Sequence, residues 1–584
     1  MALDLLIRGG TLVDGRGGPP RPADVGVADG RFVAIGDLRG ESAAETIDAA
    51  GALVTPGFVD LHTHYDGQVS WDADLAPSSQ HGVTTAIMGS CGVGFAPART
   101  ADRARLIALM EGVEDIPGAA LAEGIQWGWE SFPEYLDALD ARPHAIDFGA
   151  HVPHDALRVY VMGDRAEANE VATDDDISAM RRELRDALEA GAIGFSTGRT
   201  DNHRSAAGTA TPASEANTRE LVGLAGAFVG LDHGILQAVS DFDMARGPEP
   251  FEREFDVIEQ MALAAGGHPT SISLMQRDGA PDQWRHILRR VDASAAPLHV
   301  QVAPRAIGVL LGLECTFQPF MGKPSYKAIA ALPLAERVRR MADPAVRARI
   351  LAEPSDKVAG DGSAIPPLAD GLLATMDRLA FRLFRLGDNP DYEPPMSASI
   401  GAAAKARGQA PLEALYDTLL ESDGKELVYF PIFNYGGFDL EAVRTMMEHP
   451  RALPGLSDGG AHVGTICDAS FPTFFLTHWA RDRATGRWPV ERAVKFLSAD
   501  TARYAGFSDR GTVEVGKKAD LNVIDHAALR LYRPRLVADL PAGGRRLLQG
   551  VSGYRATVVS GQVIARDGVY TGACPGRVVR GGRR

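Results

Sequence analysis

The amino-acid sequence predicts an α/β protein: a (β/α)8 barrel of the TIM type joined to a small composite β-sandwich formed by both ends of the chain. Three observations predict this fold class. The chain has 584 residues, more than one ordinary domain holds. Through its middle, short apolar runs alternate with amphipathic helical stretches. At its two ends, short strand patterns are separated by turn-forming residues.

Both ends of the chain have the texture of small antiparallel sheets. Apolar runs at residues 5–7, 11–13, 24–27 and 31–35 are separated by Gly-Gly, Asp-Gly and Gly-Gly-Pro-Pro. Similar runs recur at residues 511–513, 519–524 and 556–564. We therefore expect residues 1–55 and 506–584 to pair into one β-sandwich domain, with the rest of the chain folding between them.

The middle of the chain, residues 56–505, is expected to form the barrel. A helix is predicted at residues 174–190, where Ile177, Met180, Leu184 and Leu188 recur at helical spacing. No GxGxxG motif follows the first strand, which disfavours a dinucleotide-binding fold. Strands alternating with helices in this way favour a barrel over an open sheet. The eight expected strands are residues 57–61, 84–88, 145–149, 192–196, 234–239, 270–274, 298–302 and 452–457.

The segment at about residues 317–431 is predicted to be an insertion before the last barrel strand. It contains two helical runs and a middle rich in Pro, Asp and Gly, residues 354–370. Long irregular segments of this kind are usually functional loops, so we expect a lid or an oligomer contact.

Composition restricts the class of partner. A net charge of −16 argues against nucleic acid, whose phosphates need a basic face. No apolar run approaches the length of a membrane span, and the N-terminus has no basic region before its apolar residues. The four cysteines are widely separated, which suits a reducing compartment. We expect a cytoplasmic homo-oligomer that acts on a small-molecule substrate, without nucleic-acid or membrane partners.

Two histidines mark the candidate active site. His62 and His64 end the first expected barrel strand, and side chains two apart on a strand project to the same face. The carboxyl ends of barrel strands form the mouth where active sites lie. Two imidazoles there are part of a site for a divalent ion such as zinc, so the pair predicts a metal-dependent hydrolase.

Longer motifs around these histidines resemble a known family. Residues 54–64 read Val-Thr-Pro-Gly-Phe-Val-Asp-Leu-His-Thr-His and resemble the opening signature of the amidohydrolase superfamily. Residues 510–521 read Arg-Gly-Thr-Val-Glu-Val-Gly-Lys-Lys-Ala-Asp-Leu and resemble its closing signature. More narrowly, Gly-Val-Thr-Thr at 82–85 and Met-Gly-Ser-Cys-Gly-Val-Gly at 88–94 resemble the N-acyl-D-amino-acid deacylase (D-aminoacylase) family. The resemblance spans almost the whole chain apart from the insertion.

The resemblance implies a set of metal ligands. The family's paired histidines correspond to His62 and His64, its metal-bridging cysteine to Cys91, and its last-strand aspartate to Asp458. Asp458 is followed by two glycines, which let the backbone approach a ligand closely. Beside a metal-bound water, Asp458 can ligate the ion and accept the proton as general base.

The chain departs from the family pattern at two places. The family has single histidines at the ends of the fifth and sixth strands, where this chain has Ala238 and either Leu274 or Met275. His233 lies at the opposite end of the fifth strand. The remaining ligands suffice for one ion, with a position left for water. We therefore expect one zinc ion, although other divalent metals would also suit these ligands.

Three further residues are weaker candidates for substrate contact. His154 follows the third strand in a setting similar to that of a family histidine, and Asn434 lies on a Gly-rich loop. His462 is four residues beyond Asp458, where a structural histidine at a helix start is an equal alternative. The acidic cluster at residues 111–115 is interpreted as a polar loop.

The predicted activity is metal-dependent hydrolysis of a non-peptide amide bond, as the resemblance to N-acyl-D-amino-acid deacylases implies. An alternative keeps the site but changes the bond to a cyclic amide, lactam, imide or ester, which the apolar residues on the fifth and sixth strands favour. A third hypothesis, a non-catalytic barrel used for binding, is disfavoured by the joint retention of His62, His64, Cys91 and Asp458.

Overall fold

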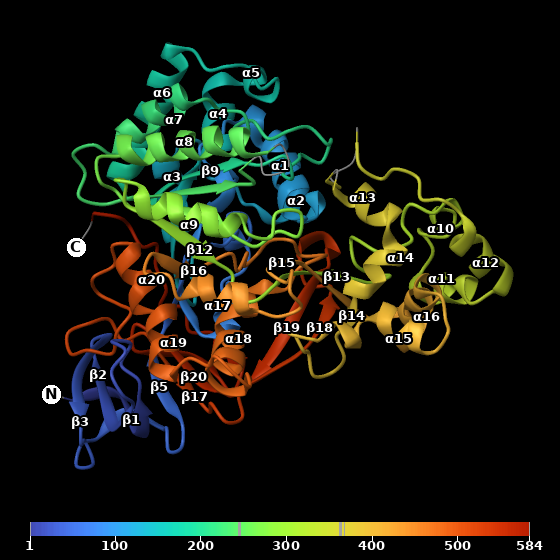
Figure 1. Ribbon diagram of the computed structural model, residues 1–584. Helices are drawn as coiled ribbons and strands as arrows, with labels where there is room; N and C mark the ends of the chain where they lie inside the picture. Colours follow the sequence, from blue (N-terminus) through green and yellow to red (C-terminus); the bar gives the residue numbers. More distant parts are fainter. Residues whose placement is uncertain (1, 243–246, 361–364, 367, 583–584) are drawn as a thin grey trace.

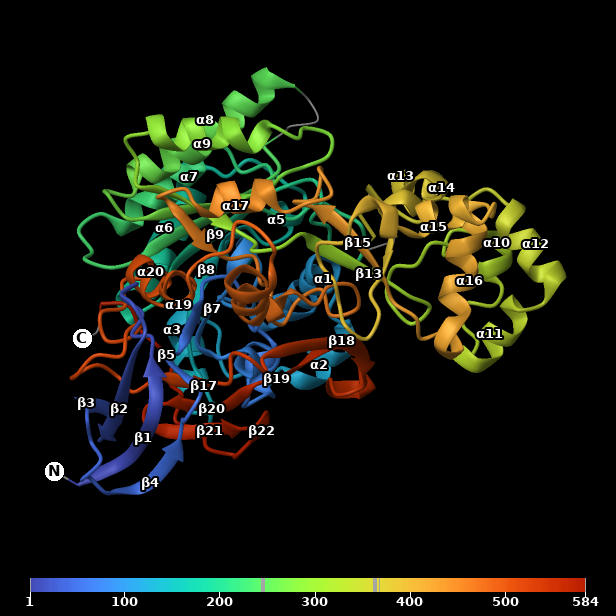
Figure 2. The ribbon, with the colours of Figure 1, turned by 60° about the horizontal axis from the view of Figure 1, so that its bottom comes forward.

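The computed structural model describes residues 2–242, 247–360, 365–366 and 368–582. It contains a parallel barrel, a β domain made by both ends of the chain, and a helical insertion (Figure 1). In both ribbon views the β domain lies below the barrel and the insertion projects to its right (Figures 1 and 2).

The eight strands of the barrel follow one another in chain order. Their hydrogen-bonded order is β6-β7-β8-β9-β10-β11-β12-β16. All neighbouring pairs in this series are parallel. The strands are β6 (Phe58–Asp60), β7 (Val83–Met88), β8 (Asp147–Pro153), β9 (Gly194–Arg199), β10 (Ile235–Ser240), β11 (Thr270–Leu274), β12 (Leu298–Val302) and β16 (Ala452–Pro454).

The predicted fold class is confirmed, and each predicted barrel strand overlaps one of these eight. The predictions for β11 and β12 have the observed bounds. The prediction at 145–149 begins and ends too early, because β8 runs from Asp147 to Pro153. Fully buried strands lack polar alternation, so their ends carry no periodic signal.

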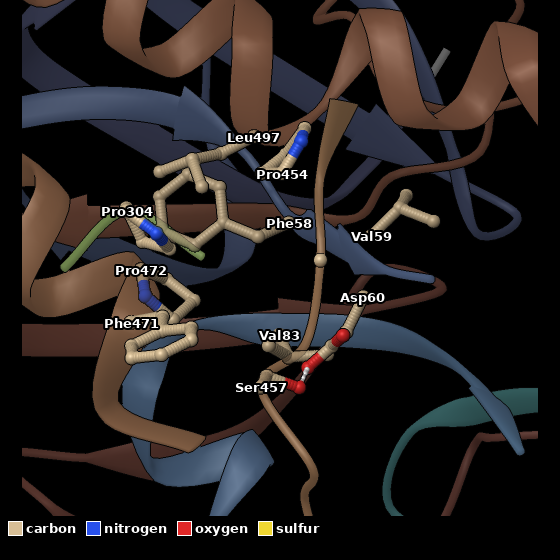
Figure 3. Close-up of a pocket in the computed structure, with 11 residues that line it drawn as sticks. Phe58, Val59, Asp60, Val83, Pro304, Pro454, Ser457, Phe471, Pro472 and Leu497 are labelled. Atoms are coloured by element: carbon tan, nitrogen blue, oxygen red, sulfur yellow. Dashed lines mark hydrogen bonds between the residues drawn. The ribbon is translucent and has the colours of Figure 1, made fainter. Parts of the chain in front are cut away.

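The barrel closes between β6 and the segment after β16. Thr63 and Gly459 form a parallel bridge, and the His64 amide donates to the Gly459 carbonyl over 2.8 Å. Below this seam, the Ser457 hydroxyl donates to the Asp60 carboxylate over 2.6 Å (Figure 3). The pocket in Figure 3 is lined mainly by apolar side chains from both strands and from the helices outside them, such as Phe471 and Leu497. It therefore belongs to the packing of the seam.

Helices pack around the strands. The predicted helix at 174–190 is confirmed as α6 (Asp174–Ala190), and it starts with a capping box in which Thr173 and Asp176 bond each other's backbone amides. The other helices of the barrel region are α1 (Arg103–Glu114), α2 (Gly118–Gly124), α3 (Phe132–Asp140), α4 (His154–Met162), α5 (Asp164–Glu167), α7 (Thr218–Ala225), α8 (Pro248–Ala264), α9 (Gln283–Ala293), α17 (Glu441–Met447), α18 (Phe471–Phe474), α19 (Val490–Leu497) and α20 (Ala499–Tyr504).

The two ends of the chain share one sheet with its own hydrophobic core. The strand order is β22-β21-β20-β17-β5-β1-β2-β3, and β4 also pairs with β1. Strand β5, from the N-terminal segment, pairs with β17, from the C-terminal segment. The strands are β1 (Leu3–Leu12), β2 (Arg21–Ala28), β3 (Arg31–Gly36), β4 (Ala43–Asp48), β5 (Leu53–Pro56), β17 (Leu521–Ile524), β20 (Tyr554–Val559), β21 (Gln562–Arg566) and β22 (Val569–Tyr570).

The number of strands in this domain differs from the prediction. The runs predicted at 5–7 and 11–13 are one strand, β1, which continues through a register irregularity between Ile7 and Gly10. The run at 556–564 is two strands, β20 and β21, joined by a tight turn. A separate hairpin, β18 (Arg530–Val537) and β19 (Arg546–Ser552), was not predicted.

The insertion leaves the barrel through a three-stranded sheet of β13 (Ile307–Leu311), β15 (Val428–Phe433) and β14 (Phe384–Arg385). Its helices enclose a separate apolar core that includes Phe320, Met341 and Tyr416. Part of the predicted Pro/Asp/Gly-rich stretch, residues 361–364 and 367, lies outside the described residues. The helices are α10 (Pro324–Lys327), α11 (Leu334–Met341), α12 (Pro344–Ala352), α13 (Leu368–Ala374), α14 (Met376–Leu379), α15 (Ile400–Ala406) and α16 (Pro411–Gly424).

Within the described part of the chain, no helix has the length and apolar character needed to cross a membrane.

Candidate metal centre

His62 and His64 follow β6 at the mouth of the barrel, and both side chains are buried. The Nε2 atom of His62 lies 3.2 Å from the Cys91 thiol sulfur and 3.3 Å from Asp458 Oδ1. The Nε2 atom of His64 lies 3.7 Å from the same Asp458 oxygen. The structure therefore brings together the four residues that the sequence predicted as metal ligands.

Cys91 reaches the site from a short 3-10 turn, Ser90–Gly92, that follows β7. Its backbone is left-handed, with φ of 58°, and its amide donates to the Gln237 side-chain oxygen over 3.0 Å. A non-glycine residue in this conformation is held there by its surroundings. One ligand atom from each of His62, His64 and Cys91 lies within 4.8 Å of the others, close enough to share one ion.

Asp458 lies four residues beyond the last strand, with its side chain 15% exposed and φ of 50°. Its amide donates to the His62 carbonyl over 3.2 Å. Gly460, with φ of 92°, has no room for a side chain, because a Cβ there would lie 2.9 Å from the His64 carbonyl oxygen. The glycines after Asp458 thus allow this loop to lie against the two histidines, as the sequence suggested.

The electrostatics suit metal binding. Burial lowers the pKa of His64 to about 4, so the ring is neutral near pH 7, which is the form that binds a metal. Burial raises the pKa of Asp458, but the neighbouring His64 and the charges of His62 and His462 outweigh this and hold it below its ordinary value. Burial, with the charges of Glu114 and Asp458, raises the pKa of the Cys91 thiol.

These residues fit a divalent cation. Both ring nitrogens of His64 are buried and make no hydrogen bond, which is unusual for buried polar atoms. Imidazole nitrogen, thiolate sulfur and carboxylate oxygen are the donors that zinc prefers. A cation in contact with the thiol would also favour its deprotonated form.

The fifth and sixth strands, β10 and β11, contribute no histidine. Gln237, not Ala238, is the residue of β10 that faces Cys91. On β11, Ser271 accepts a hydrogen bond from Gln301 over 2.9 Å. Leu274 packs into the main core of the barrel, whereas Met275 packs in a small cluster with Leu456, two residues before Asp458. Only Met275 of this pair therefore lies beside the loop that carries Asp458.

His462 lies next to the predicted ligands and is in contact with Glu114. The Nε2 atom of His462 is 4.0 Å from Asp458 Oδ2 and 3.5 Å from Glu114 Oε2. The interpretation of residues 111–115 as a polar loop is wrong for Glu114, which ends α1 and is only 1% exposed. Its other oxygen, Oε1, lies 3.3 Å from His64 Nδ1.

The two other candidates for substrate contact have partners within the protein. The His154 ring nitrogens lie 3.0 Å from Thr197 Oγ1 and 2.9 Å from Glu220 Oε1. Asn434, with φ of 66°, accepts from the Gln276 amide over 2.7 Å. Their described contacts do not include the four metal-ligand candidates, so their roles in substrate binding stay predictions.

Three other residues lie near the site, and two of them, Gln301 and His203, were not selected from the sequence. Gln301 on β12 lies 2.8 Å from His62 Nδ1 through its side-chain oxygen. Burial, with the charges of His462 and His64, lowers the pKa of His203 to about 3, and burial and the charge of His62 do the same for His151. The only signal in the sequence was position, because Gln301 and His151 lie on predicted strands or directly after them, and many polar residues share that property.

The chain is similar to known proteins over nearly its whole length. Residues 45–565 match the family described as the amidohydrolase family. D-aminoacylase of Alcaligenes xylosoxydans xylosoxydans is 29% identical over 581 residues, which covers 99% of this chain and 97% of that protein. The N-acyl-D-aspartate deacylase of the same organism is 38% identical over 195 residues, 33% of this chain and 36% of that protein.

Solved structures give the same result for the fold. A D-aminoacylase structure described by its binuclear metal centre has a TM-score of 0.63 at 25% identity, covering 99% of this chain and all of that one. N-acyl-D-glutamate deacylase from Bordetella bronchiseptica, complexed with zinc and a phosphonate inhibitor, has a TM-score of 0.63 at 23% identity over 99% of this chain. The chain therefore belongs to the amidohydrolase family, as a metal-dependent hydrolase that acts on carbon–nitrogen bonds other than peptide bonds and is similar to D-aminoacylase.

Proposed function

We propose that this chain hydrolyses the amide bond of an N-acylated small molecule, using one divalent ion held by His62, His64, Cys91 and Asp458. The observation that carries the proposal is that Cys91 Sγ and Asp458 Oδ1 both lie within 3.3 Å of His62 Nε2. These atoms come from the ends of the first, second and last barrel strands, where active sites of this fold form.

The residues would divide the reaction as follows. His62 and His64 would hold the ion through ring nitrogen atoms, and Cys91 and Asp458 would supply a thiolate sulfur and a carboxylate oxygen. When bound, the ion would polarise the scissile carbonyl and lower the pKa of an attacking water. The neighbouring histidines lower the pKa of Asp458, so its carboxylate is ionised and can accept the water's proton. It then passes that proton to the leaving amine, which departs neutral.

One ion suits the residues present better than two. Gln237 occupies the place on β10 that faces Cys91, and an amide is a weak ligand for zinc beside imidazole and thiolate. The related D-aminoacylase is described as having one-metal activation and second-metal attenuation. A single zinc ion is therefore compatible with hydrolysis.

A second candidate substrate class is a lactam, cyclic imide or other cyclic amide. Met275 and Leu456 form an apolar cluster next to Asp458, with Ile307 and Phe471. An apolar wall there favours a less polar substrate over an N-acyl amino acid with a charged side chain.

The predicted reducing, cytoplasmic setting fits four cysteines that are all free. The oligomeric state and a lid role for the insertion stay predictions.

The test combines metal analysis with turnover. Purified wild-type protein is analysed for metal per chain and assayed with N-acyl-D-amino acids, N-acyl-L-amino acids, lactams and cyclic imides. We expect about one zinc per chain and turnover of at least one amide class. His62→Ala should lose the metal and lower kcat/KM by at least about 100-fold, because loss of a ligand exceeds the ~10–100-fold effect of losing a ligand's partner.

His286→Ala provides the matched control, since His286 is partly exposed and bonds Glu252 on another helix. It should keep both metal and turnover. Turnover of cyclic amides alone would favour the second substrate class. A wild-type chain without bound metal, or a His62→Ala variant with unchanged turnover, would contradict the proposal.

A further inference from the structure

The C-terminus of α1 places a buried carboxylate between two histidines of the metal centre. Glu114 is 1% exposed, and neither of its carboxylate oxygens makes a hydrogen bond. Oε1 lies 3.3 Å from His64 Nδ1, and Oε2 lies 3.5 Å from His462 Nε2. A carboxylate this deeply buried is costly unless it faces cationic or hydrogen-bond-donating groups, so its position requires an explanation.

The two imidazoles of the site have matching surroundings. The Nδ1 atom of His62 faces a side-chain oxygen of Gln301 at 2.8 Å, and the Nδ1 atom of His64 faces Glu114. The Nε2 atoms of both rings lie toward Asp458 Oδ1. When Nε2 binds a cation, Nδ1 carries the ring proton and needs an acceptor. Gln301 is in place to accept it from His62, and Glu114 is in place to accept it from His64.

The surrounding chain holds Glu114 in this place. The neighbouring Asp115 carboxylate accepts from the Gly464 amide over 3.1 Å and from the Thr316 hydroxyl over 2.9 Å. The His462 amide donates to the Glu114 carbonyl. The preceding turn of α1 is in close contact with another loop, because a Cβ on Gly112 would lie 2.2 Å from the Arg204 carbonyl oxygen. The last turn of α1 is thus fastened to the loop that follows Asp458.

We infer that Glu114 is a positioning residue of the metal centre, which fixes the tautomer and orientation of His64 and holds His462 beside Asp458. This inference rests on the proposed function, because it assumes an ion on His64 Nε2. Carboxylates that accept from the far nitrogen of a metal-bound histidine orient the ring and make it a stronger ligand, and removing such partners costs about 10–100-fold in metal affinity. Glu114 would act through His64 and not on the substrate.

The geometry separates this role from that of a metal ligand. Glu114 faces the Nδ1 side of His64, whereas Asp458 faces the Nε2 side. Losing Glu114 should therefore weaken the site without removing a ligand.

The test measures zinc affinity of the whole chain by competition with a chromophoric chelator at one near-neutral pH. Glu114→Leu should weaken zinc binding by about 10–100-fold, and Glu114→Gln, which keeps an acceptor oxygen, should weaken it less. Asp155→Leu is the matched control, because Asp155 is equally buried and has one carboxylate oxygen without a partner, yet contacts no predicted ligand. Its zinc affinity should equal that of the wild type.

A second measurement covers the case in which Glu114→Leu does not fold. The cobalt(II) form of Glu114→Gln should then differ from the wild type in its visible spectrum, whereas the cobalt form of Asp155→Asn should not. Equal affinities for wild type and Glu114→Leu, or equal losses in Glu114→Leu and Asp155→Leu, would overturn the inference while leaving the proposed function intact. A wild-type chain that binds no zinc would instead overturn the proposed function, and this inference with it.

Discussion

At the scale of single residues, the metal centre consists of ligand atoms and the groups that orient them. His62 Nε2 lies between Cys91 and Asp458, while Nδ1 of the same ring faces Gln301. The Gln301 side chain is itself held by donating to the Ser271 hydroxyl over 2.9 Å. A hydrogen-bond chain of this kind fixes which nitrogen of His62 is available to a cation.

Gln301 therefore has a testable effect. Replacing it by leucine removes the acceptor for His62 Nδ1, so zinc affinity should fall by about 10–100-fold, while the ligands themselves remain. Chelator competition measures the change. Ser273→Ala is the control, because this buried hydroxyl on the neighbouring strand makes no hydrogen bond. A Gln301→Leu variant with wild-type affinity would show that His62 needs no such partner.

The residues that were easy to predict differ from those that were missed in how much local signal they carry. His62, His64, Cys91 and Asp458 lie in short motifs at strand ends, so the sequence points to each of them. Glu114 lies in a run of charged residues that looks solvent-exposed. Its burial arises from the contacts of Asp115 with Gly464 and of Gly112 with Arg204, which join segments far apart in sequence. No local pattern predicts such contacts.

At the scale of elements, a buried charge network joins α4 and α7 behind the fourth strand. The Glu220 carboxylate accepts from His154 Nε2 over 2.9 Å and from Arg158 Nη1 over 2.6 Å. Arg158 and Glu220 are at most 2% exposed. The imidazole of His154 also lies 3.0 Å from Thr197 Oγ1 on β9. The network thus links two helices to one barrel strand.

Removing Glu220 should destabilise this part of the fold. Glu220→Ala leaves the Arg158 guanidinium buried without its partner, so we expect a loss of about 3–5 kcal/mol in the free energy of unfolding. Urea unfolding followed by circular dichroism measures it. Glu189→Ala removes an exposed partner of Arg185 on α6 and should cost no more than about 0.5 kcal/mol. Equal losses of unfolding free energy in Glu220→Ala and Glu189→Ala would show that the buried charge network does not stabilise this part of the fold.

Prediction of the elements succeeded where the pattern is local and failed where pairing decides. The α6 helix has an apolar stripe and a capping box, and its predicted bounds are the observed ones. Within the β domain, one continuous strand was read as two, because Gly9 and Gly10 resemble a turn but lie within β1. The β18–β19 hairpin was missed because β18 contains three arginines and a proline, and β19 has no clear alternation of polar and apolar residues.

At the scale of the whole molecule, Asp147 joins the barrel to the β domain. Its carboxylate, on β8, accepts from Arg510 Nη1 and from Lys518 Nζ, each over 2.6 Å. The same carboxylate accepts from the Arg577 amide of the C-terminal segment over 2.9 Å. Because Asp147 is 2% exposed, these contacts hold three positions of the C-terminal segment around one buried charge of the barrel.

This cluster predicts a pH-dependent stability. Burial raises the pKa of Asp147, but Lys518 and Arg510 outweigh burial and lower it below its ordinary value of 3.8. The Asp147 carboxylate therefore contributes to the free energy of unfolding above its ordinary pKa. This contribution is lost as the pH falls through the lower pKa that the group has in the folded state. Asp147→Asn should lower the Tm at neutral pH and reduce the free energy of unfolding by about 3–5 kcal/mol. The difference from the wild type should shrink below about pH 4.

Calorimetry across this pH range checks the expectation. Asp37→Asn, which removes one half of an exposed ion pair with Arg39, serves as the control and should leave the Tm unchanged at every pH. A difference between wild type and Asp147→Asn that stays constant into the acid range would show that the carboxylate charge does not hold the two units together.

The sequence by itself determined the fold class, the order of the barrel strands and the four candidate ligands. These features follow from hydrophobic patterns and short motifs, in which each residue's role depends on its near neighbours. Only the tertiary structure decided that Gln237 and not Ala238 faces Cys91, because a shift of one residue exchanges the two faces of a strand. It alone placed Gln301 and Glu114 behind His62 and His64, since those contacts join segments separated by many residues and form only when the barrel closes.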